Sequence, residues 1–427
     1  MISVEEFRPL LAARAQDFLK LANGLFEASP EQWNQRQLYH LYQSTTDLES
    51  YLDNYGAREN RTYLPIRELI AIARWLSVGM SSLVHLDSRL PSYSFPDPAW
   101  VGERLAPTVR TSALRLGEMI LRSLEALRET WTETGLSWPD GVMRVDSLAA
   151  AGETVRLPRD AVDQVGNEES RALVSRAALV ASRFLRLQKH MARSNPRRIN
   201  GLERLEEVVQ VHCSEAQSRR FEARLHNLQS TYDSLVAGSP EEEKHPVLPR
   251  IRSAASTAFH LFEATTALVH LDERHRLDRF RGADGEALLD REAFLSIAIN
   301  DCSVMAYECM TSVAPEAEAF LAQVSERCSR VFRVPDGVSL HARPISLIVS
   351  VVNHYRSAVE AEIDGDRCSA ASIMQLLVLV GGHSSTREIR FYGDQRVLDD
   401  LQVLFEARLG EDGLDGLPES LSYLVQR

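Results

Sequence analysis

Apolar side chains recur every three or four positions through most of residues 4–322, which is the spacing of amphipathic α-helices. Near the start of this region, Ser29 followed by Pro30 predicts a capped helix start. The region is therefore predicted to be all-α. The clearest helical stretches are expected at 38–52, 66–86 and 106–134.

Two short motifs occur twice along this helical region at nearly the same distance. Gln43–Asp47 reads Gln-Ser-Thr-Thr-Asp and returns as Gln-Ser-Thr-Tyr-Asp at 229–233, 186 residues further on. Leu83–Asp87 reads Leu-Val-His-Leu-Asp and returns unchanged at 268–272, 185 residues further on. We therefore predict a tandem duplication of a helical bundle. The two copies are expected at 1–138 and 169–322, with a linker or small hairpin at 139–168.

The pattern changes beyond residue 325, where short alternating stretches typical of strands appear between helical ones. Asp364-Gly365-Asp366 indicates a hairpin turn, and Gly381-Gly382 is expected to end a short helix. The predicted order is strand, helix, strand, strand, short helix, strand, helix. This order predicts an α/β open-faced sandwich, with three helices on one face of a four-stranded antiparallel sheet. The sandwich is expected at 325–411, with strands near 359–363 and 387–391, later helices at 369–379 and 399–409, and a C-terminal tail at 412–427.

One histidine stands at a predicted helix start inside this last region. Ser339–Pro344 reads Ser-Leu-His-Ala-Arg-Pro and is followed by an apolar run. Pro344 fits the first turn of a helix, where a missing N–H is tolerated. The unpaired backbone N–H groups of a helix start bind anions, and Arg343 adds a planar set of donors. His341 is therefore a candidate phosphoryl acceptor, and a structural histidine is the other interpretation.

These residues and a second motif resemble the histidine-containing phosphocarrier protein HPr of the bacterial sugar phosphotransferase system. Leu340–Pro344 match the family's phosphohistidine motif Gly-Leu-His-Ala-Arg-Pro, and Ser372–Leu376 match its regulatory-serine motif Lys-Ser-Ile-Met-x-Leu. The resemblance implies an HPr-like fold for 325–411. It also implies that His341 carries phosphate on Nδ1, that Arg343 stabilises the phosphate, and that Ser372 is a regulatory phosphosite.

The same resemblance implies a set of partners. These are an enzyme I-like phosphoryl donor, an acceptor protein and an HPr kinase-like serine kinase. The expected partner-binding patch is Ile373, Met374 and Leu377. No cofactor is expected, and a homodimer is left open by the sequence.

Several positions depart from the family pattern. Val338, Ser339 and Ala371 stand where the family has asparagine, glycine and lysine, and Ser350 and Asn353 replace helix lysines that face its partners. These departures favour a regulatory or signalling role over bulk sugar uptake. A non-catalytic interaction or scaffold protein, using a divergent HPr-like domain to bind partners, is the alternative function.

Composition and charge narrow the classes of function and location that the sequence allows. The 427 residues carry a formal net charge of -12, which disfavours a nucleic-acid binder because such a protein needs a basic face. The five cysteines lack CxxC spacing, so we expect reduced thiols and neither a disulfide framework nor a metal site. The N-terminus lacks signal-peptide features and no run reaches eighteen apolar residues, so the expected location is the cytoplasm, with no membrane span.

The repeated motifs of the helical region place His85 and His270 at matching positions, each two residues before an aspartate. Residues i and i+2 of a helix point to different faces, so neither pair is a ready catalytic dyad. Packing of a buried histidine against the other repeated motif is one interpretation, and a phosphorylatable histidine in each bundle is the other. A third hypothesis is a polar pocket in each bundle, with Arg67 or Arg252 supplying charge. This pocket would be lined by Gln43, Asp47, Gln229 and Asp233. No independent catalytic site is predicted in the helical region.

Overall fold

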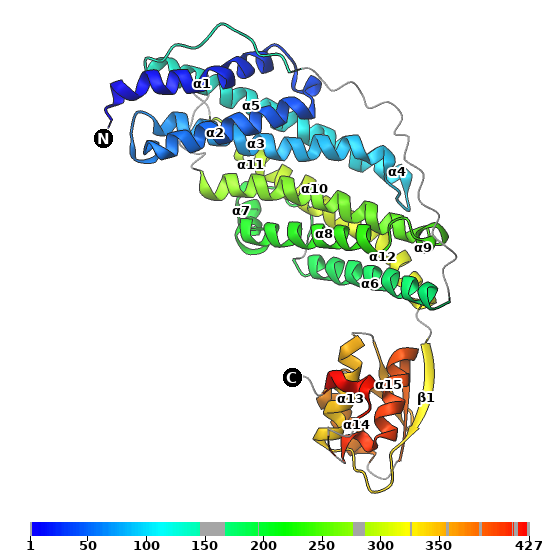
Figure 1. The fold of residues 1–427 in the computed structure, drawn as a ribbon. Coiled ribbons are helices and arrows are strands. Elements are labelled where there is room, and N and C mark those ends of the chain that lie inside the picture. The colour runs from blue at the N-terminus through cyan, green and yellow to red at the C-terminus, as the bar shows by residue number, and fades with distance from the viewer. Residues whose placement is uncertain are drawn as a thin grey trace. The chain divides into compact units, whose positions relative to one another are not determined.

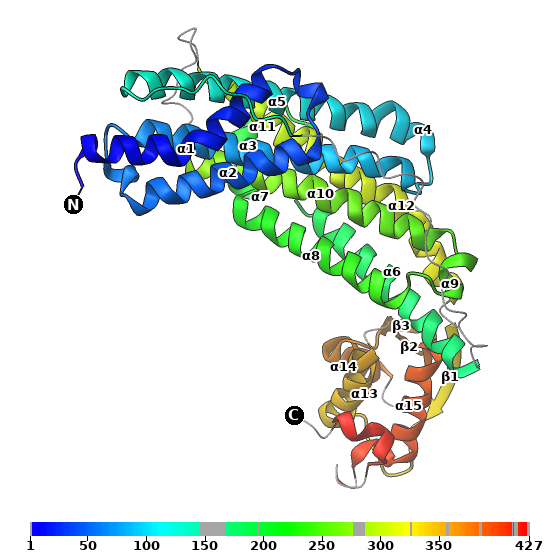
Figure 2. The same cartoon turned by 45° about the horizontal axis from the view of Figure 1, so that its top comes forward.

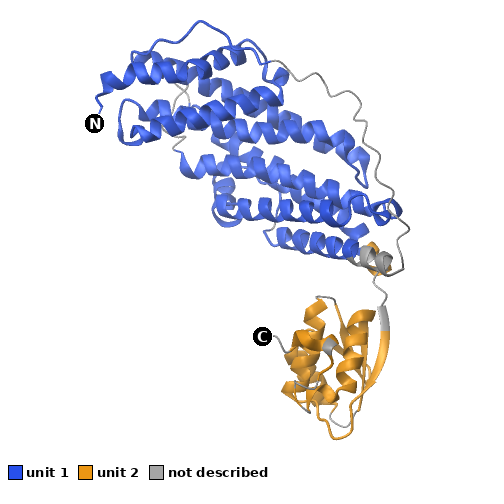
Figure 3. Ribbon diagram, viewed as in Figure 1, with its two compact units in different colours: residues 1–318 blue, residues 319–427 orange. Residues whose placement is uncertain are grey.

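The computed structural model describes residues 2–145, 167–194, 196–275, 287–324, 327–355, 358–383, 387–411, 413 and 417–424. The chain divides into two compact units, residues 1–318 and 319–427 (Figure 3). Each unit is described by itself below.

The first unit is helical, as predicted, and several of its helices begin at capping boxes. The side chain of Ser3 accepts a hydrogen bond from the Glu6 amide while Glu6 bonds back to Ser3, and Asn34 and Gln37 do the same. The helices are α1 (Val4–Phe26), α2 (Gln35–Asn54), α3 (Leu64–Arg89), α4 (Pro98–Trp100), α5 (Ala106–Glu133), α6 (Asn167–Ala192), α7 (Leu202–His212), α8 (Glu215–Leu235), α9 (Pro240–Lys244), α10 (Val247–Arg274), α11 (Arg291–Ser296) and α12 (Val304–Val324). π-helical turns at Val101–Leu105 and Ile297–Ser303 precede α5 and α12.

One sequence expectation needs adjustment here. Ser29 makes no side-chain cap, and Pro30–Gln32 form only a short 3-10 turn because α2 is capped by Asn34 instead. The predicted linker at 139–168 lies largely outside the described residues. Its first part is anchored to α1, since the Asn23 amide donates to the carbonyl oxygens of Pro139 and Gly141 at 2.7 and 2.9 Å.

The helix α3 is the core helix of this unit. It packs against α2, α5 and α10, and most of its apolar residues are buried. Among the described residues, Leu64–Ser92 is the stretch long and apolar enough to cross a membrane, and 61% of its most apolar window is buried inside the unit. A mostly buried core helix passes the same length and composition test.

The two halves of the helical unit meet along α3 and α10, which lie side by side in both views (Figures 1 and 2). The ring contacts across this interface are reciprocal. Trp75 packs on His270 with ring centroids 3.9 Å apart, and His85 packs on His260 at 4.6 Å. Positions 75 and 260 are 185 residues apart, as are 85 and 270. The tandem duplication itself stays a prediction.

The second unit contains a four-stranded antiparallel sheet in the order β1-β4-β2-β3. Along β4, Ile389 and Phe391 are buried while Glu388 and Arg390 are exposed, so one face of the sheet forms the core with the helices. The element order is the one predicted: β1 (Arg327–Arg333), α13 (Ala342–Tyr355), β2 (Glu360–Ile363), β3 (Asp366–Ser369), α14 (Ile373–Gly382), β4 (Glu388–Asp394) and α15 (Gln395–Glu406).

The β2–β3 hairpin turns where the sequence indicated. Asp364 and Gly365 have φ values of 51° and 95°, the left-handed pair that a tight two-residue hairpin needs. The two later helices were predicted with wrong bounds at both ends, 369–379 and 399–409 against Ile373–Gly382 and Gln395–Glu406. The helix α14 continues through Gly381 and Gly382, and α15 begins four residues early because Asp394 caps it by accepting from the Arg396 amide at 3.0 Å. In the tail, Leu421 is fully buried against this unit.

Candidate functional site

His341 lies directly before α13, at the helix start that the sequence predicts. Its carbonyl oxygen accepts the first helical hydrogen bond, from the Ile345 amide at 3.1 Å, so His341 is the N-cap residue. The side chain is 51% exposed. Pro344 lies in the first turn and is buried in the core. His341 is therefore held rigidly by its backbone while its ring faces solvent.

The two ring nitrogens of His341 have different neighbours. Nδ1 accepts from the Arg343 main-chain N–H at 3.4 Å, while Nε2 lies 3.3 Å from the Glu411 carboxylate. A ring nitrogen that accepts from an N–H carries no proton, so in the neutral imidazole the proton lies on the other nitrogen. The contacts therefore favour the tautomer with the proton on Nε2 and the lone pair on Nδ1.

Glu411 and the Arg343 side chain meet at a left-handed turn that follows α15. Arg408, Leu409 and Gly410 have φ values of 51°, 54° and 71°. Positive φ costs roughly 1 kcal/mol for a residue with a side chain, and burial of Leu409 helps to hold the turn. The turn presents the Gly410 carbonyl oxygen to the Arg343 guanidinium at 3.2 Å and Glu411 to His341.

Ser372 is the N-cap of α14. Its hydroxyl oxygen accepts from the Gln375 amide at 3.4 Å, and the residue is half-buried. A phosphate here would meet the positive end of the helix dipole. The position therefore suits a cap and a phosphorylated serine alike.

The predicted partner-binding patch lies on α14, which packs against α13. Ile373 and Met374 are 40% and 70% exposed, whereas Leu377 is partly buried against the core. Val378, which the sequence analysis did not single out, is 71% exposed. It lies four residues after Met374, on the same side of the helix, so the helical spacing could have identified it.

His85 and His270 lie away from the aspartates that follow them in sequence. Nδ1 of His85 lies 3.0 Å from the Gln35 amide nitrogen, and Nδ1 of His270 lies 2.9 Å from Glu215. Burial, foremost among several causes, lowers the pKa of both imidazoles. Both histidines are half-buried and take part in the ring contacts between the two halves.

The arginines of the predicted polar pockets, Arg252 and Arg67, have different partners in the two halves. Arg252 pairs with Asp233 at 2.7 Å, as the hypothesis requires. Arg67 instead pairs with Glu49, Asp53 and Glu68, and Asp47 is exposed. In the part of the chain that the structure describes, no group of three or more His, Cys, Asp or Glu side chains is placed to hold a metal ion.

Comparison with known proteins bears on the second unit. The family model described as "PTS HPr component phosphorylation site" matches residues 328–407. No curated protein and no solved structure matches the chain. The helical region before residue 328 is unrecognised. Residues 328–407 form an HPr-like domain, which implies a phosphocarrier-type function and interaction with proteins of the phosphotransferase system.

Proposed function

We propose that His341 accepts a phosphoryl group on Nδ1 from an enzyme I-like, phosphoenolpyruvate-dependent donor, and that the protein acts in regulation rather than bulk sugar uptake. The observation that carries the proposal is the setting of Nδ1. This atom faces the Arg343 N–H at an open helix N-terminus, on a side chain that is half exposed.

The proposed step needs no proton transfer. The Nδ1 lone pair attacks phosphorus, the bond from phosphorus to the donor breaks, and its electron pair stays with the donor. Nε2 keeps its proton, so the phosphorylated ring is cationic, and the Glu411 carboxylate 3.3 Å away offsets that charge. Arg343 is already within the same turn and would move from the Gly410 carbonyl to the phosphoryl oxygens.

Incubation of the full chain with enzyme I and labelled phosphoenolpyruvate tests this proposal. We expect one phosphoryl group per chain in the wild type and none in His341→Ala. The matched control is His354→Ala, an exposed histidine at the other end of α13, which should label as the wild type does. Absence of label from the wild type, or label retained in His341→Ala, contradicts the carrier proposal.

Ser372 is proposed as a second regulatory site. Phosphorylation would place about two negative charges at the start of α14, next to Ile373 and Met374. We expect an HPr kinase-like enzyme to modify Ser372 and to weaken docking of the donor. Mass spectrometry after kinase treatment locates the phosphate. Ser369 is the comparison site, because it lies three residues away and outside any helix. Phosphate on Ser369 instead of Ser372 would contradict the proposal.

The regulatory part of the proposal rests on the fusion of the two units and on the departures from the family pattern. Ser350 and Asn353 leave this part of α13 without the family's lysines, which suits one dedicated partner better than broad exchange. A tethered domain has an effective concentration near millimolar for whatever the helical unit binds. Amide hydrogen-exchange protection in the helical unit should differ with and without phosphate on His341. Identical protection in both states would mean that phosphorylation of His341 does not affect the helical unit.

The alternative, a non-catalytic interaction protein, is favoured by the apolar exposure of α14. Met374 and Val378 are each at least 70% exposed, which is typical of a binding surface. This function needs no phosphate on His341. Partner binding that is abolished by Met374→Asp and unaffected by His341→Ala would support it over the carrier.

A further inference from the structure

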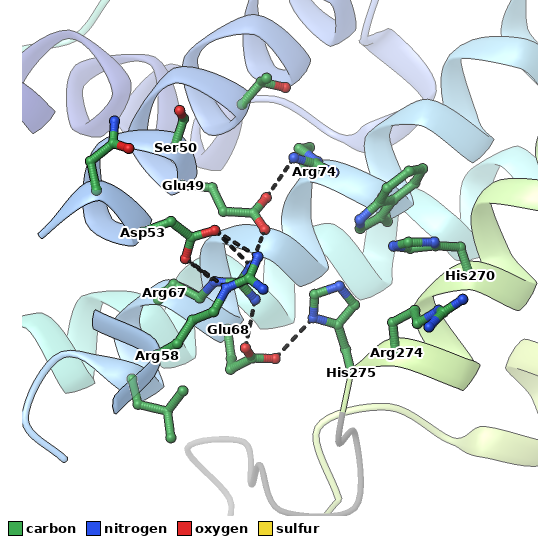
Figure 4. Close-up of a pocket in the computed structure, with 14 residues that line it drawn as sticks. Glu49, Ser50, Asp53, Arg58, Arg67, Glu68, Arg74, His270, Arg274 and His275 are labelled. Atoms are coloured by element: carbon green, nitrogen blue, oxygen red, sulfur yellow. Dashed lines mark hydrogen bonds and ion pairs between the residues drawn. The ribbon is translucent and has the colours of Figure 1, made fainter. Parts of the chain in front are cut away.

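A cleft with a volume of about 910 Å³ opens in the helical unit, between α2, α3 and the C-terminal end of α10 (Figure 4). This volume is in the range of sites for small molecules. The α2 and α3 walls belong to the first half of the unit and the α10 wall to the second. Most of the lining side chains are polar or charged, among them Glu49, Asp53, Arg58, Arg67, Arg74 and Arg274.

A buried ionic network forms the floor of the cleft. Arg67 is 4% exposed and contacts Glu49, Asp53 and Glu68 at 2.6, 2.9 and 2.6 Å (Figure 4). Arg74 pairs with the second oxygen of Glu49 at 2.7 Å, and His275 with the second oxygen of Glu68 at 2.9 Å.

Each carboxylate oxygen of this floor lies within ion-pair distance of an arginine or histidine nitrogen, although Glu49 Oε2 accepts no hydrogen bond from the described residues. Each of the two oxygens of Asp53 also contacts an arginine nitrogen, from Arg58 or Arg67. Both oxygens of each of the three lining carboxylates are therefore neutralised by a nearby cationic side chain.

Two N–H donors of the cleft are left without an acceptor in the described part of the chain. The Arg74 Nε and Trp75 Nε1 groups are buried, and neither has an acceptor among the residues that the structure describes. A buried N–H without an acceptor costs roughly 1–3 kcal/mol, so such groups usually indicate a missing partner. The Arg74 guanidinium lies 4.6 Å from the Trp75 ring centroid, so the two groups sit together. These two neighbouring donors would be satisfied by an acceptor that a ligand brings into the cleft.

Two charged residues of this network, Glu68 and Arg74, have no charged counterpart at the corresponding positions of the other half. The residues 185 positions after Glu68, Arg74 and Trp75 are Ser253, Phe259 and His260. Buried ion pairs rarely add stability relative to apolar packing, so the fold does not require them here. Charges that these corresponding positions do not share are better explained by a ligand than by a requirement of the fold.

We propose that this cleft binds a small multivalent oxyanion through Arg58, Arg74, Trp75 and Arg274. The side chains of Arg58 and Arg274 at the rim are 64% and 65% exposed and can turn to a ligand. The four lining arginines balance the three carboxylates and the adjacent Glu215, which pairs with Arg274. The cleft is thus neutral on a protein with a net charge of -12, and an anion meets no net repulsion there. The anionic oxygens could come from phosphate or from carboxylate.

Isothermal titration of the full chain with inorganic pyrophosphate and with citrate, at matched ionic strength, tests the proposal. We expect saturable binding of one ligand per chain for at least one of the two, and the preferred one assigns the anion as phosphate or carboxylate. Arg274→Ala and Arg58→Ala should each weaken binding by about tenfold, since each removes a charge-assisted donor. Trp75→Phe keeps the ring and removes the N–H, and should weaken binding a few-fold.

The matched control is Arg110→Ala. The Arg110 side chain is 65% exposed and pairs with one carboxylate, Asp87 at 2.9 Å, outside the cleft lining. Its replacement should leave anion binding unchanged. Absence of saturable binding of both anions by the wild type overturns the proposal. Equal weakening by Arg110→Ala and Arg274→Ala overturns it as well, because the anions would then respond only to the general charge of the surface.

Discussion

The His341 site and the floor of the helical cleft use the same side chains in opposite settings. Each combines a histidine, an arginine and a glutamate. The His341 ring is 51% exposed and its Nδ1 faces a single main-chain N–H, whereas the His275 side chain is 5% exposed and pairs with Glu68 at 2.9 Å. In the first site the imidazole remains accessible; in the second the imidazole is part of a closed ionic network.

Under the proposed function, solvent access, more than residue type, separates the phosphoryl acceptor His341 from the structural His275. An exposed ion pair contributes about 0–1 kcal/mol, and its members remain available to react. A buried pair is costly to break, so its members stay engaged. The comparison leads to three tests, which begin with the buried network.

The largest effect is expected for Arg67→Ala. This substitution leaves Glu49, Asp53 and Glu68 without their shared cation in a buried place, and should lower the free energy of unfolding by about 3–5 kcal/mol. All five tryptophans lie within residues 1–318, so tryptophan fluorescence during urea unfolding follows the helical unit alone.

Arg58→Ala is the control for that experiment. Arg58 also pairs with Asp53, but its side chain is 64% exposed, so its loss should cost less than about 1 kcal/mol. Similar urea unfolding midpoints for Arg67→Ala and Arg58→Ala would contradict the view that the buried ion pairs are more costly to break than the exposed one.

A smaller effect is expected at acid pH. Burial alone raises the pKa of Glu215, but hydrogen bonds from His270, Arg219 and Arg274 outweigh it and lower the pKa to about 2. A carboxyl whose pKa is lowered on folding stabilises the fold above its unfolded pKa, and that contribution is lost as the pH falls toward 2. The helical unit should lose roughly 1 kcal/mol from this group between pH 5 and pH 2.5, after allowance for solvent screening. Glu215→Gln should flatten that part of the pH profile; an unchanged profile contradicts the assignment.

The smallest effect concerns Glu411. Replacement by glutamine removes the carboxylate that offsets the cationic phosphorylated ring, so the phosphohistidine should hydrolyse several-fold faster, equivalent to about 1 kcal/mol. Glu406→Gln, an exposed carboxylate on α15, is the control and should not change the rate. An equal phosphohistidine lifetime in the wild type and in Glu411→Gln would contradict a role for Glu411 in stabilising the phosphorylated ring.

The HPr-like fold was predictable because its signals are local. Each of the two motifs, each alternating strand and the Asp364-Gly365 turn is formed by residues that lie close together in the sequence. The boundary at Gly381 was missed because glycine is only a weak helix breaker, costing roughly 1 kcal/mol, and packing of the flanking residues outweighs it.

The neighbours of the functional groups were less predictable, because they come from distant parts of the chain. Glu411 reaches His341 only through the left-handed turn at Arg408 and Leu409, which no sequence pattern announces. Arg67 was recognised as a source of charge, but its partners depend on how α2 packs against α3. Helix periodicity predicts which residues are buried, but it does not specify which side chains pair across an interface.

The most direct test of the phosphocarrier account is the identity of the phosphorylated atom. Histidine labelled with nitrogen-15 in the full chain, phosphorylated with enzyme I and phosphoenolpyruvate, can be followed by long-range proton–nitrogen correlation spectra. We expect one imidazole, assigned to His341 by its absence in His341→Ala, to carry phosphate on Nδ1 and a proton on Nε2. Phosphate on Nε2, on another histidine or on none would contradict the account.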